Sequence, residues 1–191
     1  MFMWGSKNPE LEAESLWNYE ISFSQCLWDN RLSYDINLFH IDGDNLIVTQ
    51  TTENGMKNVN TGKVKNTGVE VQFNYQVSSS FALNANYSYL HMEHPVVGSP
   101  EHKGFVGANY SHKRWNLATG VQHVNGLYTS VSTKQSTQET FTLWNMTVNY
   151  QLNKHLSLYL KGENLLAESY EINAGYPLPK ATFMGGFHLQ F

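Results

Sequence analysis

The sequence predicts an all-β fold, in which antiparallel strands form the wall of a transmembrane β-barrel, and three observations lead to it. Hydrophobic and polar residues alternate with a period of two, while the period of amphipathic helices is nearly absent. Most alternating segments are longer than globular strands and match the roughly nine to eleven residues that a tilted strand needs to cross a bilayer. The connections between them are alternately short and long.

About nine strands account for the alternating segments. The alternation is clearest from Trp17 to Ser24 and from Phe81 to Tyr89, and it is weakest in the two segments at the middle of the chain. The expected strands span about residues 14–25, 31–41, 66–77, 80–92, 102–112, 115–125, 139–150, 155–164 and 181–191.

The two faces of these strands differ in a way that favours lipid on one side. In the clearest segments the polar face is mostly Asn, Ser and Gln, and the hydrophobic face has no Lys, Arg, Asp or Glu. A Lys or Arg facing lipid near the midplane would cost about 2–4 kcal/mol, so this absence is expected of a membrane wall. Charges on the polar face are few, and we expect Asp35, Glu70, Lys161 and Glu163 to face the lumen.

The connections predict which end of the wall faces the periplasm. Short turns at 26–30, 76–80, 112–114 and 151–154 alternate with long connections at 42–65, 93–101, 126–138 and 165–180. Outer-membrane barrels have short periplasmic turns and long outer loops. Aromatic residues flank the short turns and are expected to form the girdle at the periplasmic interface. They are Phe23, Trp28, Tyr75, Phe81, Tyr110, Trp115 and Tyr150.

Composition excludes several classes of protein. The 191 residues suffice for one domain, only 15% are charged, and the net charge of −4 gives no basic surface for nucleic acid. The single cysteine, Cys26, excludes a disulfide framework and a cysteine-rich metal site, and we expect an inert thiol beside a turn. The first residues do not have the pattern of a signal peptide, and no apolar stretch is long enough for a membrane helix.

The strand count predicts that part of a barrel is missing. Single-chain bacterial barrels usually have an even number of strands and both termini in the periplasm. The last expected strand ends at Phe191 on the short-turn side, so the first of nine begins on the long-loop side. We therefore expect the C-terminal part of a larger barrel. The alternative is an additional strand near residues 1–13 or 46–52.

Short motifs along the chain stand in the order and spacing of one known family. They are Asn8-Pro9-Glu10-Leu11 before Tyr19-Glu20, Asn37-Leu38-Phe39 before Asp42 and Asn45-Leu46-Ile47, Asn66-Thr67-Gly68-Val69-Glu70, Tyr87-Ser88-Tyr89-Leu90, Pro100-Glu101-His102, Glu163-Asn164-Leu165-Leu166 before Tyr170, Gly175-Tyr176-Pro177-Leu178-Pro179-Lys180, and Phe191. Together they resemble the C-terminal barrel part of TonB-dependent outer-membrane receptors. One departure is Lys180, where the family usually has Gly-Arg.

The resemblance implies a domain division and a function. Residues 1–13 would be an outer-loop remnant, and residues 14–191 would be the last nine of about 22 strands. The whole receptor would be no enzyme and hold no cofactor. It would import a large scarce ligand, such as a ferric siderophore, haem or cobalamin, across the outer membrane of a Gram-negative bacterium. The N-terminal plug, the TonB box and the preceding strands are not in this sequence, so TonB would act only through the missing plug.

The resemblance also assigns a role to the last strand. Phe183, Phe187, Leu189 and Phe191 lie on one face and resemble the signal that the barrel-assembly machinery reads, although simple contact with outer-membrane lipid would explain them too. For the four lumen-facing charges, contact with the plug and exposure to solvent both remain open.

Three smaller groups of residues have an ordinary explanation beside a functional one. His91-Met92-Glu93-His94 with His102 could hold a metal or haem, but the segment fits a solvated outer loop better. Asp42-Gly43-Asp44-Asn45 has calcium-binding residue types without the EF-hand spacing, and a turn is expected there. Ser88 and His91 point to opposite faces of one strand, which disfavours a hydrolase site.

Two other classes of protein remain as alternatives. One is a self-contained small outer-membrane barrel, either porin-like or enzymatic. The other is a soluble β-sandwich that binds a partner, because alternation by itself also fits a sheet with one wet face.

Overall fold

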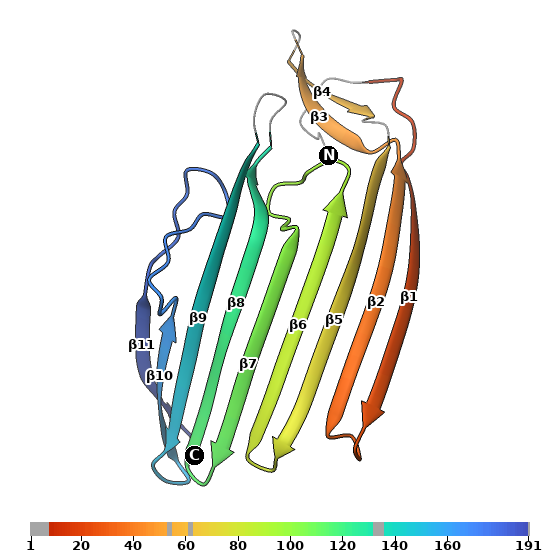
Figure 1. Ribbon diagram of the computed structural model, residues 1–191. Coiled ribbons are helices and arrows are strands. Elements are labelled where there is room, and N and C mark those ends of the chain that lie inside the picture. Colours follow the sequence, from red (N-terminus) through yellow and green to blue (C-terminus); the bar gives the residue numbers. More distant parts are fainter. Residues whose placement is uncertain (1–7, 53–54, 61–62, 132–135, 191) are drawn as a thin grey trace.

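The computed structural model describes residues 8–52, 55–60, 63–131 and 136–190 of the chain. Most of them form one nine-stranded antiparallel sheet whose neighbours follow the chain order (Figure 1). The strands are β1 (Ser15–Leu27), β2 (Leu32–Asp44), β5 (Val64–Ser78), β6 (Phe81–Met92), β7 (His102–His112), β8 (Trp115–Ser130), β9 (Thr137–Gln151), β10 (Leu156–Glu163) and β11 (Thr182–Leu189). No helix in the described residues is long and apolar enough to span a membrane.

All nine expected strands are present, and the largest difference is in the connection expected at 126–138. There β8 continues to Ser130 and β9 already begins at Thr137. Asn125-Gly126 is a typical turn dipeptide, but Gly126 takes a φ of +67° inside β8, where the register with β9 shifts. The strand continues past this irregularity because Val124 and Leu127 on either side of it are buried.

A second difference lies in the connection expected at 42–65. It contains a hairpin of β3 (Ile47–Thr52) and β4 (Gly55–Asn60), which among the described residues pair only with each other (Figure 1). The alternative of an additional strand near residues 46–52 is therefore correct in part. That strand exists, but it does not belong to the main sheet. The turn expected at 42–45 was also wrong in part, because β2 runs to Asp44 and only Asn45 leaves the strand, with a φ of 59°.

The hairpin is tied to the segment that precedes β1. The Asn60 amide donates to the carbonyl oxygens of Glu12 and Asn45, at 3.1 and 2.6 Å, and its Oδ1 accepts from the Glu12 backbone N–H at 2.9 Å. The Glu14 carboxylate accepts from the backbone N–H of Ile47 at 2.6 Å. These bonds satisfy backbone groups that lie outside the strand ladders.

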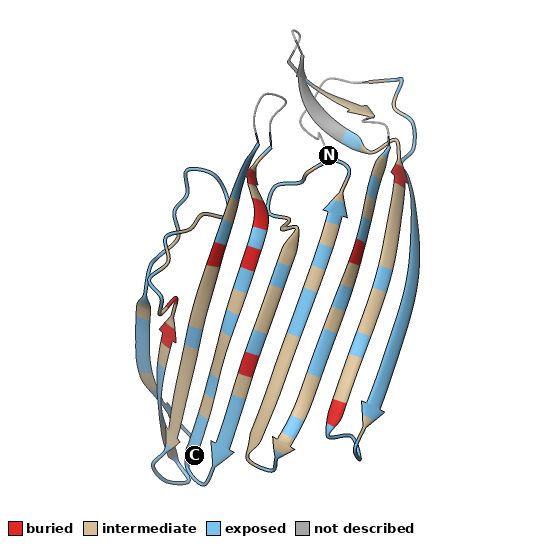
Figure 2. Cartoon of the chain, in the orientation of Figure 1, coloured by how far each residue is buried: buried red, intermediate tan, exposed pale blue. Residues whose placement is uncertain are grey.

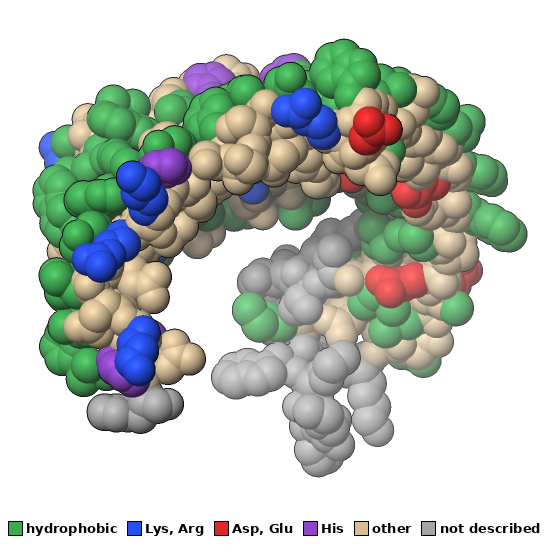
Figure 3. Space-filling model, turned by 90° about the horizontal axis from the view of Figure 1, so that it is seen from below, with side chains coloured by type: hydrophobic (Ala, Val, Ile, Leu, Met, Phe, Trp, Pro, Cys, Tyr) green, Lys and Arg blue, Asp and Glu red, His purple; other side chains and the backbone are tan. Residues whose placement is uncertain are grey.

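The main sheet is curved, with hydrophobic side chains on its convex face and mostly polar ones on its concave face (Figure 3). Little of it is buried (Figure 2): among the described residues the only buried hydrophobic side chains are Leu32, Val124, Leu127 and Phe141. By contrast, Ile21 is 72% exposed. A water-soluble domain buries such surface, so the convex face has the character of a membrane wall.

The sheet is open. β1 and β11 each have one neighbour, and no hydrogen-bonded pairing joins them among the described residues. The fold is thus a transmembrane barrel wall with two free edges rather than a closed barrel.

The connection between β10 and β11 folds back against the sheet. Asn164 is buried, and its amide donates to the carbonyl oxygens of Glu168 and Pro179, at 2.8 and 3.1 Å, while its Oδ1 accepts from the Glu168 N–H at 3.0 Å. Tyr170 packs on Phe141, with ring centroids 4.4 Å apart. The motif from Glu163 to Tyr170 therefore shapes this loop.

Candidate functional site

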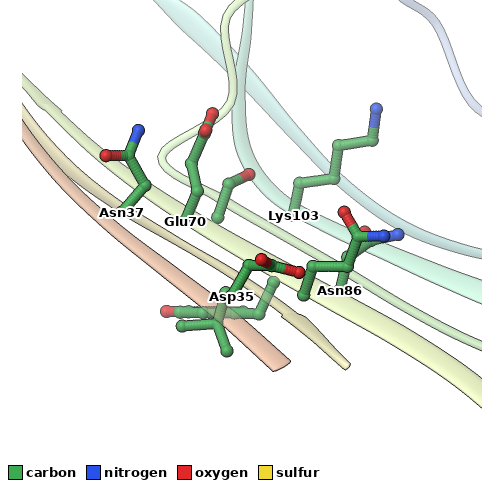
Figure 4. A pocket seen from close by; sticks show the side chains of 9 residues that line it. Asp35, Asn37, Glu70, Asn86 and Lys103 are labelled. Atoms are coloured by element: carbon green, nitrogen blue, oxygen red, sulfur yellow. The ribbon is translucent and has the colours of Figure 1, made fainter. Parts of the chain in front are cut away.

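The concave face carries a polar basin between β2 and β7. It has a volume of about 330 Å³, and most of the residues that line it carry carboxylate, amide or hydroxyl groups, together with the Lys103 ammonium. Asn37, Glu70 and Lys103 extend from different strands to the same side of the sheet (Figure 4). The strand register explains this, because Glu70 pairs with Asn37 on β2 and with Ser88 on β6, and Ser88 pairs with Lys103.

The charges of the basin have no partner in the described part of the chain. The salt bridges among the described residues join only Lys63 to Asp44 and Lys161 to Glu163, the second at 2.6 Å. The four charges expected in the lumen thus divide into two sets. Lys161 and Glu163 neutralise each other, whereas Asp35 and Glu70 are exposed to the concave side. The basin can accept hydrogen bonds or a cation from a polar partner.

Two further hollows on the concave face have several amides in their lining. One, of about 410 Å³, lies beside the short turns and includes Asn74, Asn84 and Arg31. The other, of about 270 Å³, includes Asn84, Asn109 and Asn145. The Asn109 amide donates to Asn84 Oδ1 at 3.4 Å. Neutral amides present donors and acceptors without the desolvation cost of charges, so this wall can contact a polar body without binding it tightly.

Aromatic rings lie close over two glycines on the same face. A Cβ on Gly120 would lie 2.5 Å from the Phe105 ring, and one on Gly68 would lie 2.3 Å from Phe39 Cζ. The rings therefore occupy the space that a side chain would need at these two positions. The sequence shows no signal for this, because each ring and its glycine lie on different strands whose register is not given by the pattern.

The expected girdle residues lie near the short turns. Trp28 packs on Tyr75 and Trp115 on Tyr150, with ring centroids 5.8 and 4.5 Å apart. Phe81 pairs with Tyr110 across β6 and β7, and Phe23 is 54% exposed. That these rings contact the membrane interface stays a prediction.

The residues of the expected assembly signal lie on the last strand. Phe183 and Phe187 are 69% and 66% exposed, and their register partners on β10 are Gly162 and Leu158. Leu189 lies on the same face opposite Leu156. Phe191 lies outside the described residues.

The smaller candidate groups do not assemble into a reactive centre. In the described residues no group of three or more His, Cys, Asp or Glu is placed to hold a metal ion. His91 and His94 are exposed, and His102 bonds to Tyr87 instead. Ser88 pairs with Glu70 and Lys103 on the concave face, and Cys26 is exposed at the end of β1.

Comparison with models of protein families identifies the family of this chain. A family model described as TonB dependent receptor-like, beta-barrel, matches residues 2–165. The chain belongs to this family. TonB-dependent receptors are transport receptors of the Gram-negative outer membrane, and the resemblance found in the sequence is therefore confirmed.

Solved structures of TonB-dependent receptors share the fold. The ferric-catecholate import receptor Fiu of Escherichia coli K12, in a closed form, is 18% identical with a TM-score of 0.77, over 100% of this chain and 30% of that one. A variant of the ferric enterobactin receptor PfeA of Pseudomonas aeruginosa, in complex with enterobactin, is 16% identical with a TM-score of 0.76, over 95% and 32%. The copper transporter OprC is 14% identical with a TM-score of 0.75, over 95% and 32%. This chain thus spans about a third of each of these three receptors.

Proposed function

We propose that the chain forms the C-terminal wall, residues 14–191, of an outer-membrane receptor for TonB-dependent uptake of an iron–siderophore complex, with residues 1–13 as part of an outer loop. The observation that carries the proposal is the two-sided sheet: a hydrophobic convex face, a polar concave face and two free edges. Structures named as receptors of ferric catecholate and ferric enterobactin share its fold. Import of a large polar ligand through a barrel needs a polar lumen, and the concave face would supply part of it.

Within that receptor the chain would supply wall and outer loops. The free edges of β1 and β11 would pair with the missing strands, since lipid cannot satisfy their backbone groups. The exposed carboxylates Asp35 and Glu70 would contact the missing plug, through which alone TonB would act. The described residues offer no catalytic constellation, and we propose a transport role without enzymatic activity or a cofactor.

We also propose how the wall enters the membrane. The convex face would contact outer-membrane lipid, and the aromatic rings near the short turns would lie at the periplasmic interface. Phe183, Phe187, Leu189 and Phe191 would be read by the barrel-assembly machinery as the last strand is inserted.

Heat-modifiable migration in detergent tests the proposal. The chain is refolded alone and together with the plug and preceding strands of a family member. We expect a compact, heat-sensitive band that binds ferric siderophore only in the mixture. A compact band of the chain alone would mean a self-contained barrel, and a soluble monomer without detergent would mean a sandwich. Either result would contradict the proposal.

A further inference from the structure

Arg31 lies at the short-turn end of the concave face and is held by the neighbouring turn. Its Nε and Nη2 donate to the carbonyl oxygens of Gln76 and Val77, at 3.3 and 2.7 Å. The backbone N–H of Gln76 donates in turn to the Arg31 carbonyl oxygen at 2.7 Å. Arg31 therefore continues the ladder between β2 and β5, on the same face as Ser33. These bonds give the guanidinium a fixed place on the wall.

Only one edge of this guanidinium is used. A guanidinium has five N–H donors in a planar fork, and the bonds from Nε and Nη2 lie along one edge of it. The other edge, formed by Nη1 and the second N–H of Nη2, donates to no described residue and joins no described carboxylate in a salt bridge. Two parallel N–H donors of this kind bind a carboxylate with two hydrogen bonds.

The hollow of about 410 Å³ places neutral amides around Arg31. Asn30, Asn74, Asn84 and Asn109 are among the residues that line it, and no other charged residue of the described chain does. Asn84 Oδ1 accepts from the Asn109 amide at 3.4 Å, and the Asn84 amide nitrogen donates to no described residue. An anion at Arg31 would therefore meet a further N–H donor and no carboxylate.

The acidic residues nearest in sequence do not neutralise Arg31. Asp29 belongs to the same turn, but it forms no salt bridge with a described residue. Asp35 lies on the same face four residues further along the chain, which is about 13 Å at the rise of a strand. Within the described chain, the Arg31 guanidinium is thus positioned but not paired with an anion.

We propose that the hollow at Arg31 binds one carboxylate at the periplasmic mouth of the lumen. The carboxylate would accept two hydrogen bonds from the free edge of the guanidinium and another from the Asn84 amide nitrogen. A single fixed cation matches the single charge of a carboxylate, whereas a phosphate dianion would keep part of its charge unpaired. The inference rests on the proposed function, which makes the concave face the lumen. The carboxylate has two sources, an Asp or Glu side chain of the missing plug and a free ligand in the lumen.

Carbodiimide coupling tests the first source in the chain assembled with the plug and preceding strands. Arg31→Lys keeps the positive charge and places a primary amine at the hollow, and carbodiimide joins an amine to a carboxylate in contact with it. We expect mass spectrometry to locate an amide between position 31 and an Asp or Glu of the plug, in roughly tenfold higher yield than from position 114 in Arg114→Lys. Arg114→Lys is the matched control, because it makes the same change in another short turn, outside the hollow.

Protection from phenylglyoxal, which modifies arginine, tests the second source in the assembled wild type. Citrate is the probe, and Arg114 is the reference in the same sample. If a free carboxylate occupies the hollow, citrate should slow modification of Arg31 roughly tenfold and leave Arg114 unchanged. If a side chain of the plug occupies it, citrate should have no effect, and the amide of the first experiment should form.

Three results would overturn the inference. One is the absence of an amide to the plug together with no protection by citrate. Another is an amide to the plug from positions 31 and 114 in equal yield. The third is an amide from position 31 to Asp29 or Asp35, which would mean that the chain neutralises Arg31 itself.

Each variant is compared only if its assembled barrel still migrates as a compact, heat-sensitive band. An absence of that band in the wild type would contradict the proposed function instead, so the two failures are distinguishable.

Discussion

At the scale of single residues, the important contacts lie between strands. Sequence alternation correctly predicts which face Asp35 or Glu70 occupies, because each side chain alternates with its neighbours. It gives no register, and register decides that Tyr87 meets His102 or that Phe39 covers Gly68. These contacts could therefore not be predicted from the sequence.

Gly68 gives a prediction about packing on the concave face. A Cβ at this position would lie 2.3 Å from Phe39 Cζ and 2.7 Å from the backbone oxygen of Tyr89, which cannot rotate away. We expect Gly68→Ala to lower the free energy of unfolding by about 1–3 kcal/mol, as overpacking does. Urea unfolding of the assembled barrel in vesicles measures it. Gly104→Ala is the control, since its space is open, and equal effects of both variants would refute the explanation.

Asn164 gives a second prediction, on the loop between β10 and β11. Replacement by Ala removes three hydrogen bonds, leaves backbone groups unsatisfied and places Ala at a φ of 49°. We expect a loss of about 1–3 kcal/mol, local to residues 165–180, seen as faster amide hydrogen exchange there. Asn164→Gly separates the loss of the side-chain bonds from the strain of the positive φ, because glycine tolerates that φ but has no amide side chain. We expect fast amide hydrogen exchange in this variant as well. Protection like that of the wild type would contradict the role of the side chain.

At the scale of elements, the strand pattern is informative and the connections are less so. Strand alternation predicts all nine strands of the main sheet, because most of them have one hydrophobic face along their length and the two weaker ones, β7 and β8, keep part of it. The extension of β8 was not predicted, and a strand near residues 46–52 was expected only as an alternative and not as half of a separate hairpin. In both places the decisive feature is a contact between residues distant in sequence. In the extension of β8, Val124 and Leu127 are buried in one cluster with Phe141. In the hairpin, Asn60 is hydrogen-bonded to Glu12.

The hairpin contact yields an element-scale prediction. Asn60→Ala should loosen the β3–β4 hairpin from Glu12 without disturbing the main sheet, because no described strand of that sheet pairs with the hairpin. Limited proteolysis should cut the hairpin severalfold faster, while the compact band of the assembled barrel persists. Lys57→Ala in the same hairpin is the control. Equal cleavage of Asn60→Ala and wild type would show that these bonds do not hold the hairpin.

At the scale of the whole molecule, two properties define the wall: its faces are opposite in polarity, and its edges are free. Strand parity predicts the free edges, and the open sheet agrees with it. The ligand could not be predicted from this sequence. The chain spans about a third of the receptors Fiu and PfeA, and the lumen of a barrel is lined by all of its strands.

The orientation of the wall in lipid is tested most directly by two neighbouring residues. Ile21 and Ser22 lie on opposite faces of β1. In a Cys26→Ser background, Ile21→Cys and Ser22→Cys each carry a polarity-sensitive fluorophore in the assembled barrel, in vesicles with brominated lipid. We predict strong quenching of the label at position 21 by the lipid, and quenching at position 22 only by aqueous iodide. Equal quenching of both labels by lipid, or by iodide, would contradict the account.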